Sequence, residues 1–271
     1  MTILDSAILG AVEGLTEFLP VSSSGHLILM RDLLGINTSG GLAFDAILQL
    51  GAILAVFIYF RRDVWALLLD TLRIIIGRSK EVTAQQKTMI VGLIVGTIPA
   101  LILGLTLQDE METIFRSAFL VAIMLILGSL LFIFAERKAR QTTNATTISQ
   151  SWWIGCFQTL ALVPGVSRSG STIAGGLFFG LTREAAARFS FLLSLPIITG
   201  SGLKMLIDVV KGGSSVDATP LQLGIGFFLS FVVGFACIRF LMRYLKTHTL
   251  MAFVWYRLAL AAIVLIVVAA R

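Results

Sequence analysis

The sequence predicts an all-α polytopic membrane protein with about six transmembrane helices, two re-entrant helical hairpins and an inverted-topology repeat. Three observations predict this fold. The 271 residues are 57% hydrophobic and only 13% charged, with a mean hydropathy of +0.94, whereas soluble domains carry about 25% charged residues. Six apolar stretches are long enough to cross a bilayer. Two further stretches, each broken by Pro, Gly and Ser, look like copies of one element.

The six apolar stretches alternate with connections of different charge. Lys and Arg concentrate between the first and second stretches, after the third, and between the fifth and sixth. Because cytoplasmic loops carry an excess of basic residues, we expect these three connections inside the cell and both chain ends outside. The same loops account for the net charge of +6, so no nucleic-acid partner is expected. The predicted spans are residues 44–60, 89–107, 117–135, 187–207, 221–240 and 250–270.

Neither broken stretch fits an ordinary span. On this topology the first, residues 13–26, enters and leaves on the outer side, and the second, residues 158–172, enters and leaves on the inner side. Irregular backbone at membrane depth is tolerated only where it is buried in protein or lines a wet cavity. We therefore expect two re-entrant hairpins whose tips meet near the middle of the membrane.

An offset of 145 residues aligns the two broken stretches. It places Glu13 on Gln158 and Ser23 on Arg168, so that one copy supplies carboxylates and a histidine while the other supplies a cation. With three spans in each half, the two halves have opposite orientations. This arrangement is typical of inverted repeats, which place a polar site at the interface of the halves.

The two halves are predicted to form one integral membrane domain. The first repeat covers residues 1–141 and the second covers 150–271, with the polar stretch 142–150 as a linker. Cys156 and Cys237 lie in apolar contexts without framework spacing. We therefore expect two buried free thiols rather than a disulfide or a metal site.

Two carboxylates occur within the first broken stretch. Glu13 and Glu17 are four residues apart, so they face the same side of one helix. Carboxylates at membrane depth are costly and need partners. The pair is interpreted as the ligand set for a divalent cation, Mg²⁺ or Ca²⁺, which favours carboxylate oxygens, or as a general base. The alternative is a structural pair satisfied by Arg168 or by backbone.

A run of serines follows Pro20. A helix break at this proline, with a new helix starting among the serines, would leave backbone N–H groups free to bind phosphate. Ser23 and His26 share a helix face, which indicates a nucleophile and its base. The alternative is that the serines only cap the helix and His26 bonds a carbonyl. The predicted phosphate-binding residues of this turn are Ser22, Ser24 and Gly25.

The second broken stretch carries a single cation among hydroxyls. Arg168 lies in a Gly-rich break, where its guanidinium can grip a phosphate through two parallel hydrogen bonds. The alternative is that Arg168 snorkels to the interface or neutralises the glutamates. The predicted phosphate-binding residues here are Ser167, Ser169, Gly170 and Thr172.

Four other polar residues in the sequence carry weaker indications of a role. Asp45 and Gln49 share a helix face near the outer end of the first span and are candidates for lining a cavity. Arg257, inside the last span, is interpreted as a snorkelling or structural residue, and His248, in a basic loop, as inert.

Over nearly its whole length the chain resembles the undecaprenyl-pyrophosphate phosphatase family of integral membrane enzymes. The hallmark segments are Glu-Gly-Leu-Thr-Glu-Phe-Leu-Pro-Val-Ser-Ser-Ser-Gly-His at 13–26 and Pro-Gly-Val-Ser-Arg-Ser-Gly-Ser-Thr at 164–172, with Ser24 where Thr is common in the family. The resemblance implies dephosphorylation of a C55 isoprenoid pyrophosphate to the monophosphate carrier lipid of cell-wall synthesis. It also implies a bacterial cytoplasmic (inner) membrane location, a site open to the outer face, a divalent-cation requirement and bacitracin resistance on overexpression.

A mechanism built from these residues fits the resemblance. We expect Ser23 as nucleophile, His26 as base and acid or alternatively as the nucleophile itself, and Glu17 as a residue that orients this pair. Arg168 would stabilise the charge that moves in the transition state. The family's site carries over to Glu13, Glu17, Ser22, Ser23, His26, Ser167, Arg168 and Thr172.

A lipid-phosphate transporter or flippase would use the same anion site, and inverted repeats are common in carriers. It would not need a nucleophile beside a base, so Ser23, His26 and the glutamates favour an enzyme. A purely structural membrane protein would leave Arg168 and both glutamates unexplained. The expected partners are undecaprenyl pyrophosphate and the membrane, with a homodimer retained as a candidate assembly.

Overall fold

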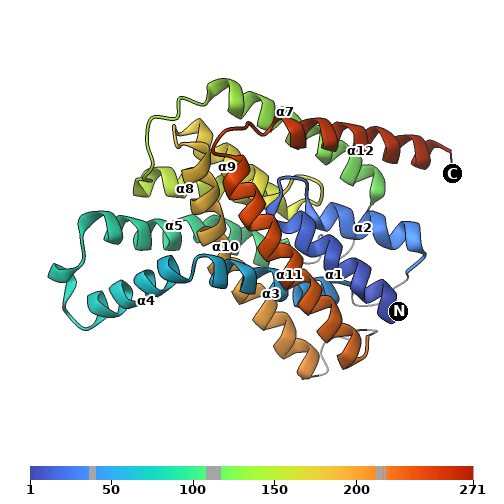
Figure 1. Ribbon diagram of the computed structural model, residues 1–271, viewed down its shortest axis with the longest axis horizontal. Helices are drawn as coiled ribbons and strands as arrows, with labels where there is room; N and C mark the ends of the chain where they lie inside the picture. The colour runs from blue at the N-terminus through green and yellow to red at the C-terminus, as the bar shows by residue number, and fades with distance from the viewer. Residues whose placement is uncertain (37–40, 108–116, 212–215, 217, 271) are drawn as a thin grey trace.

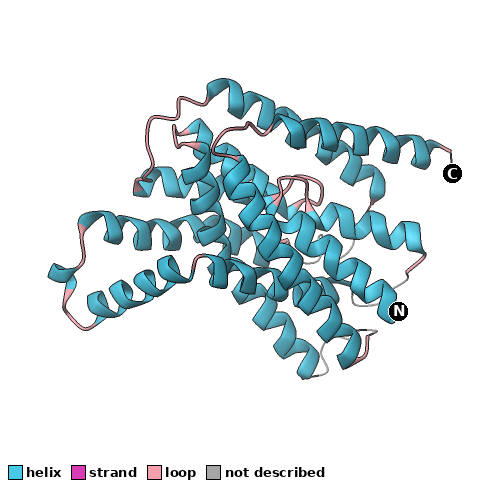
Figure 2. Ribbon diagram, viewed as in Figure 1, coloured by secondary structure: helices cyan, strands magenta, loops and turns pink. Residues whose placement is uncertain are grey.

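The computed structural model describes residues 1–36, 41–107, 117–211, 216 and 218–270. Over these residues the chain is helical, without a strand beyond one isolated bridge between Thr143 and Leu181 (Figures 1 and 2). The helices are α1 (Ile3–Phe18), α2 (Ser23–Leu34), α3 (Gly41–Tyr59), α4 (Arg61–Ile75), α5 (Ala84–Thr106), α7 (Ala118–Lys138), α8 (Ile148–Thr159), α9 (Arg168–Phe178), α10 (Arg183–Val210), α11 (Pro220–Tyr244) and α12 (Met251–Ala269), with short 3₁₀ turns at Ser79–Glu81 and Leu160–Leu162.

Six of the described helices are long and apolar enough to cross a membrane: α3, α5, α7, α10, α11 and α12. Each overlaps one predicted span, so the all-α polytopic class is confirmed. The ends differ by a few residues because side-chain caps extend the helices into polar sequence. The hydroxyl of Thr83 accepts the N–H of Gln86, and the Gln86 side chain accepts the N–H of Thr83. This capping box starts α5 five residues before the predicted span at 89–107.

Two hairpins of shorter helices lie among the spans (Figure 1). Their helices have 16 and 12 residues in α1 and α2, and 12 and 11 residues in α8 and α9, whereas a span needs about 20. The second hairpin begins at Ile148, ten residues before the predicted stretch, because Thr147 and Gln150 form a capping box. The predicted linker 142–150 is therefore partly helical.

The two hairpins pack on the spans through matching glycine contacts. A Cβ added to Gly10 of α1 would lie 2.3 Å from the carbonyl oxygen of Gly226 in α11, and one added to Gly155 of α8 would lie 2.2 Å from that of Gly96 in α5. Only glycines allow backbones to approach this closely. Since Gly10 and Gly155 are related by the offset of 145, the contacts agree with the repeat that the sequence predicts. The repeat boundaries stay a prediction.

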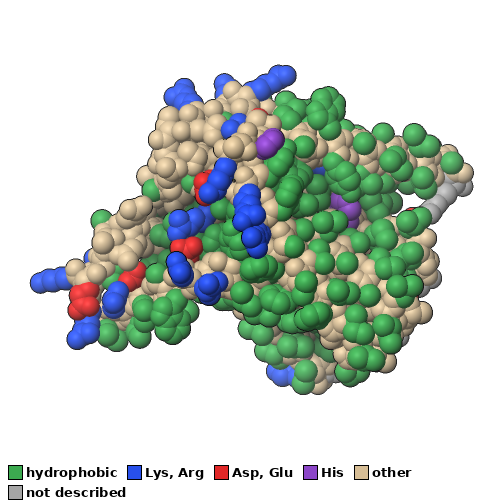
Figure 3. All heavy atoms as spheres, in the orientation of Figure 1, with side chains coloured by type: hydrophobic (Ala, Val, Ile, Leu, Met, Phe, Trp, Pro, Cys, Tyr) green, Lys and Arg blue, Asp and Glu red, His purple; other side chains and the backbone are tan. Residues whose placement is uncertain are grey.

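The distribution of charge agrees with the predicted topology. In Figure 3 the Lys and Arg side chains gather mainly over the left part of the molecule, where α4 lies and α5 and α10 begin, and apolar side chains cover much of the rest. The start of α1 and the end of α12 both lie on the opposite side in Figure 1, as expected for an even number of spans. The predicted outer connection at 108–116 lies outside the described residues, and the orientation in the membrane stays a prediction.

Helix α4, within the first basic connection, was not predicted. Its exposed apolar residues Trp65, Leu68, Leu72 and Ile75 recur at spacings of three and four residues, which is the signal that could have found it. The two cysteines are free thiols, as expected, with Cys237 buried and Cys156 only half-buried.

Candidate active site

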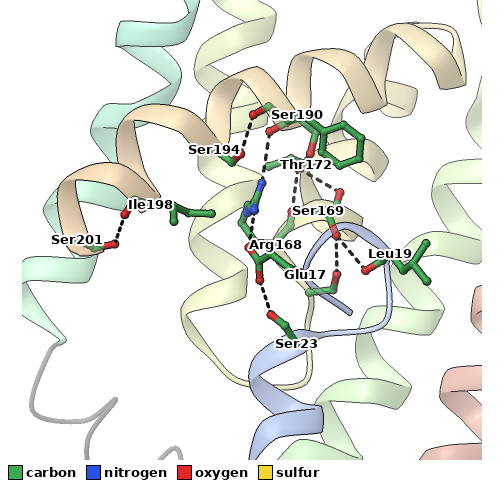
Figure 4. Close-up of polar contacts among 12 residues, drawn as sticks. Glu17, Leu19, Ser23, Arg168, Ser169, Thr172, Ser190, Ser194, Ile198 and Ser201 are labelled. Atoms are coloured by element: carbon green, nitrogen blue, oxygen red, sulfur yellow. Dashed lines mark hydrogen bonds and ion pairs between the residues drawn. The ribbon is translucent and has the colours of Figure 1, made fainter. Parts of the chain in front are cut away.

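Side chains from three helices meet where the two hairpin turns approach each other (Figure 4). Glu17 lies in the last turn of α1, Ser23 begins α2 and Arg168 begins α9. The Ser23 hydroxyl donates to one carboxylate oxygen of Glu17 at 2.5 Å. The Arg168 guanidinium donates to the other at 2.6 Å. One buried carboxylate therefore holds a hydroxyl and a cation side by side.

The two turns share an unusual backbone conformation. Ser22 and Ser167, the N-caps of α2 and α9, have φ angles of 77° and 81°, in a region that costs a non-glycine residue about 1–3 kcal/mol. Their hydroxyls accept the N–H groups of Gly25 at 3.4 Å and Gly170 at 3.1 Å. Strain of this kind clusters at functional sites. The remaining N–H groups of each first helical turn lack partners within their own helix and suit an anion.

Hydrogen bonds also join one turn to the other. The N–H of Gly165, before α9, donates to the Ser22 hydroxyl at 2.9 Å. The Ser169 hydroxyl donates to the carbonyl of Leu19 at 3.2 Å. The position of Ser23 relative to Arg168 therefore depends on both turns together.

The structure divides the predicted phosphate-binding residues into two groups. Ser22, Ser24 and Ser167 line the cavity at the site, whereas Gly25, Ser169, Gly170 and Thr172 do not. The buried Thr172 shares a hydrogen bond of 2.6 Å with the Ser190 hydroxyl and donates to the Arg168 carbonyl at 2.8 Å. Arg168 itself donates to the Ser190 carbonyl at 3.5 Å. Thr172 faces α10 rather than the cavity, so it supports the backbone of Arg168 on the side away from the cavity.

The structure does not bring His26 to Ser23. Ring nitrogen Nδ1 of His26 lies 2.7 Å from the carbonyl oxygen of Ser22, and Nε2 lies 2.7 Å from the hydroxyl of Tyr256 in α12. Since the carbonyl can only accept, Nδ1 carries a proton, and in the neutral ring Nε2 then accepts from Tyr256. The predicted contact between Ser23 and His26 is therefore not formed, and the carboxylate in contact with Ser23 is that of Glu17. His26 instead holds the carbonyl that precedes Ser23.

Glu13 lies one turn before Glu17 and is fully buried. Neither of its carboxylate oxygens has a hydrogen-bond partner among the described residues. Within the same residues, no group of three or more His, Cys, Asp and Glu side chains is placed to hold a metal. Mg²⁺, however, is commonly held by one or two carboxylates together with substrate phosphates. The unpartnered carboxylate of Glu13 beside Glu17 fits such a cation.

The site opens into a cavity of about 600 Å³. Glu17, Ser23 and Arg168 lie in its wall, and mostly apolar side chains of α3, α5 and α10 form most of the remainder. Asp45 and Gln49 line the cavity, as the sequence predicted, and Asp45 accepts a hydrogen bond from Arg31. An apolar cavity with ionic groups in its wall suits a lipid that carries an anionic head.

The chain matches the family described as "Bacitracin resistance protein BacA" over residues 6–263. The chain belongs to this family. A relative from Rubrobacter xylanophilus, named undecaprenyl-diphosphatase, is 42% identical over 267 residues, which cover 97% of both chains. Relatives of the same name come from Trichlorobacter lovleyi, 43% identical over 96% of this chain and 94% of the relative, and from Alteromonas mediterranea, 42% identical over 98% of both.

In this BacA-family chain, sequence reasoning missed residues that support the site from neighbouring spans. Ser190 braces Arg168 and Thr172, and Tyr256 binds His26. Arg257, expected to be a snorkelling or structural residue, is fully buried, which excludes snorkelling and agrees with the structural role. The Tyr-Arg pair inside an apolar span was an available signal, because polar side chains at membrane depth need partners.

Proposed function

We propose that the protein hydrolyses undecaprenyl pyrophosphate to undecaprenyl phosphate and inorganic phosphate, with Ser23, Glu17 and Arg168 as its catalytic residues. The observation that carries this proposal is the Ser23 hydroxyl, hydrogen-bonded to Glu17 beside the Arg168 guanidinium in the wall of an apolar cavity. Family membership and the names of the relatives support a phosphatase. The rival lipid-phosphate transporter would need the anion site but not a hydroxyl aligned on a carboxylate.

The hydrogen bond from Ser23 to Glu17 defines the first step. The Ser23 oxygen attacks the terminal phosphorus while Glu17 takes its proton. The bond from that phosphorus to the bridging oxygen breaks, and undecaprenyl phosphate leaves. A water molecule then attacks the phosphoserine, and Glu17 returns its proton to the departing Ser23 oxygen, which releases inorganic phosphate.

Arg168 and the starts of α2 and α9 stabilise the charge on the phosphoryl oxygens during both transfers. Because Arg168 bonds Glu17 through one arm, it holds the carboxylate in position as well as meeting the substrate. Glu13, with Glu17, would hold the divalent cation that the family resemblance implies. When bound, that cation would neutralise negative charge on the pyrophosphate.

The proposed location is the cytoplasmic membrane, with the cavity open to the outer face. Three spans contribute lining residues from the ends that the sequence predicts outside: Asp45 near the start of α3, Leu105 near the end of α5 and Met205 near the end of α10. The isoprenoid tail can then remain in the bilayer while the pyrophosphate reaches the site. Competition for this lipid would explain bacitracin resistance on overexpression.

Phosphate release from a polyprenyl pyrophosphate by the purified protein in detergent tests this function. Ser23→Ala should abolish release. Ser201→Ala is the matched control, because Ser201 lines the far part of the same cavity and donates only to the Ile198 carbonyl. A transporter would release no phosphate in the absence of a membrane, and an active Ser23→Ala enzyme would rule out the proposed nucleophile.

A further inference from the structure

Arg257 is a fully buried cation in α12 with no carboxylate partner among the described residues. Its guanidinium also lies over the ring of Phe132, 4.7 Å from the centroid. A buried charge is costly unless hydrogen bonds replace its hydration. The acceptors are the carbonyls of Pro20, Met124, Leu125, Gly165 and Val166 and the hydroxyl of Ser129, at 2.9–3.4 Å.

These acceptors come from three separate parts of the chain. Pro20 lies in the turn between α1 and α2, three residues before Ser23, and Val166 lies two residues before Arg168. Gly165 lies in the same turn as Val166, and the acceptors outside the two turns belong to α7. Nη1 of Arg257 donates both to the Pro20 carbonyl at 3.3 Å and to the Val166 carbonyl at 3.0 Å. A single guanidinium therefore joins the two hairpin turns to each other and to a transmembrane helix.

The chemistry of the acceptors excludes the two simpler roles for Arg257. Snorkelling would bring the guanidinium to the membrane surface, but the side chain is fully buried. Charge neutralisation would require a carboxylate, but its acceptors are carbonyls and one hydroxyl. The remaining role is to fix the geometry of the acceptors, because the planar guanidinium offers five N–H donors in fixed directions. Ser22 and Ser167 are strained, and such strain persists only where the surroundings over-determine it.

We infer that Arg257 is a positioning residue that holds both turns so that Ser23 and Arg168 meet on Glu17. This inference rests on the proposed function. It predicts that loosening the guanidinium disturbs the two turns selectively and slows phosphoryl transfer, while the bundle remains folded. A displacement of about 1 Å at a reacting group can cost about a hundredfold in rate.

The test uses two independent substitutions. Arg257→Lys keeps the charge but loses the planar fork. Gly128→Ala leaves Arg257 in place but adds a Cβ that would lie 2.1 Å from its Nη2, although alanine is otherwise favoured in a helix. The matched controls are Arg183→Lys, which alters a guanidinium–carboxylate pair with Glu136, and Gly224→Ala, which adds a Cβ into open space.

Two readouts separate positioning from general stability. In monodisperse detergent-purified protein, each test variant should lower kcat by about a hundredfold, with a much smaller change in KM. Hydrogen exchange should accelerate in peptides covering 19–25 and 163–170 and remain unchanged in α5 and α11. The double variant should be no slower than the worse single variant, because both substitutions disturb one guanidinium. The control variants should leave kcat and the exchange of both turns unchanged.

Three results would overturn the inference. A folded variant with unchanged exchange in the two turns would deny the positioning role even if it were inactive. Faster exchange with full activity would show that the order of the turns does not limit phosphoryl transfer, which would refute the positioning role while leaving the proposed function intact. Failure of both variants to fold, while the controls fold, would make Arg257 a brace of the whole bundle.

Discussion

Replacing Glu17 by Gln tests the proposed base most directly. The amide keeps the size of the side chain but removes the charge, and it can accept through only one of its two positions. In the wild-type protein one Glu17 oxygen accepts from Ser23 at 2.5 Å and the other from Arg168 at 2.6 Å. In Glu17→Gln the amide nitrogen takes the place of one of these two oxygens. It is a donor, so it either repels the Arg168 guanidinium or donates to the Ser23 hydroxyl. In both cases no group in contact with Ser23 can take its proton.

The expected loss follows from these contacts. Removing a general base costs about 10²–10⁴ in rate, which corresponds to about 2.7–5.4 kcal/mol in the activation barrier. Breaking a buried ion pair also destabilises a protein, by about 3–5 kcal/mol. The smaller value applies here, because Arg168 faces the cavity and keeps the Ser190 carbonyl as an acceptor. We therefore expect a folded enzyme with a lowered melting temperature and a kcat reduced by at least about a hundredfold.

The assay measures phosphate release, kcat and KM on the purified variant, with the melting temperature in detergent as a check of folding. KM should stay unchanged or fall, because Arg168 is freed from Glu17 to meet the substrate. Glu184→Gln is the matched control, since Glu184 is exposed and pairs only weakly with Lys246 at 3.5 Å. A folded Glu17→Gln enzyme with kcat within about tenfold of wild type would refute the assignment of Glu17 as base.

Three further predictions address the cation, the guanidinium and the nucleophile. Excess EDTA should abolish phosphate release, and Mg²⁺ or Ca²⁺ should restore it; full turnover in the chelator would leave Glu13 as a structural carboxylate. Arg168→Lys keeps the charge but loses the two-armed geometry, so kcat should fall by roughly a hundredfold, or about 3 kcal/mol in the activation barrier. Near-wild-type kinetics would show that Arg168 serves only to neutralise negative charge. Rapid quenching should trap an acid-stable phosphate on Ser23, and His26→Ala should retain more activity than Ser23→Ala; an acid-labile label would instead identify His26 as the nucleophile.

The secondary structure in the membrane was largely predictable. A run of apolar residues of sufficient length forms a helix in a bilayer regardless of its neighbours, because every backbone group must be satisfied within the segment. All six predicted spans are present for this reason. Helix α4 and the start of α8 were missed, because an amphipathic pattern and the Thr147 cap are weaker signals than hydropathy.

The residues of the candidate site could also be selected from the sequence, whereas the contacts between their side chains could not. Glu17, Ser23 and Arg168 stand out as candidates in the sequence because polar groups at membrane depth are costly and therefore informative. Their contacts depend on how the two turns bend, which helix periodicity does not describe. Ser23 and His26 share a helix face, yet the His26 ring turns toward Tyr256.

The sequence by itself determined the membrane class, the spans and the chemical groups of the site, because hydropathy, charge and residue type are properties of the chain alone. The tertiary structure decided which groups meet. The bond from Arg168 to Glu17, the contact of Thr172 with Ser190 and the six hydrogen bonds of Arg257 all require separate segments of the chain to pack together. Contacts of this kind arise from the shape of the packed helices, and no local pattern encodes them.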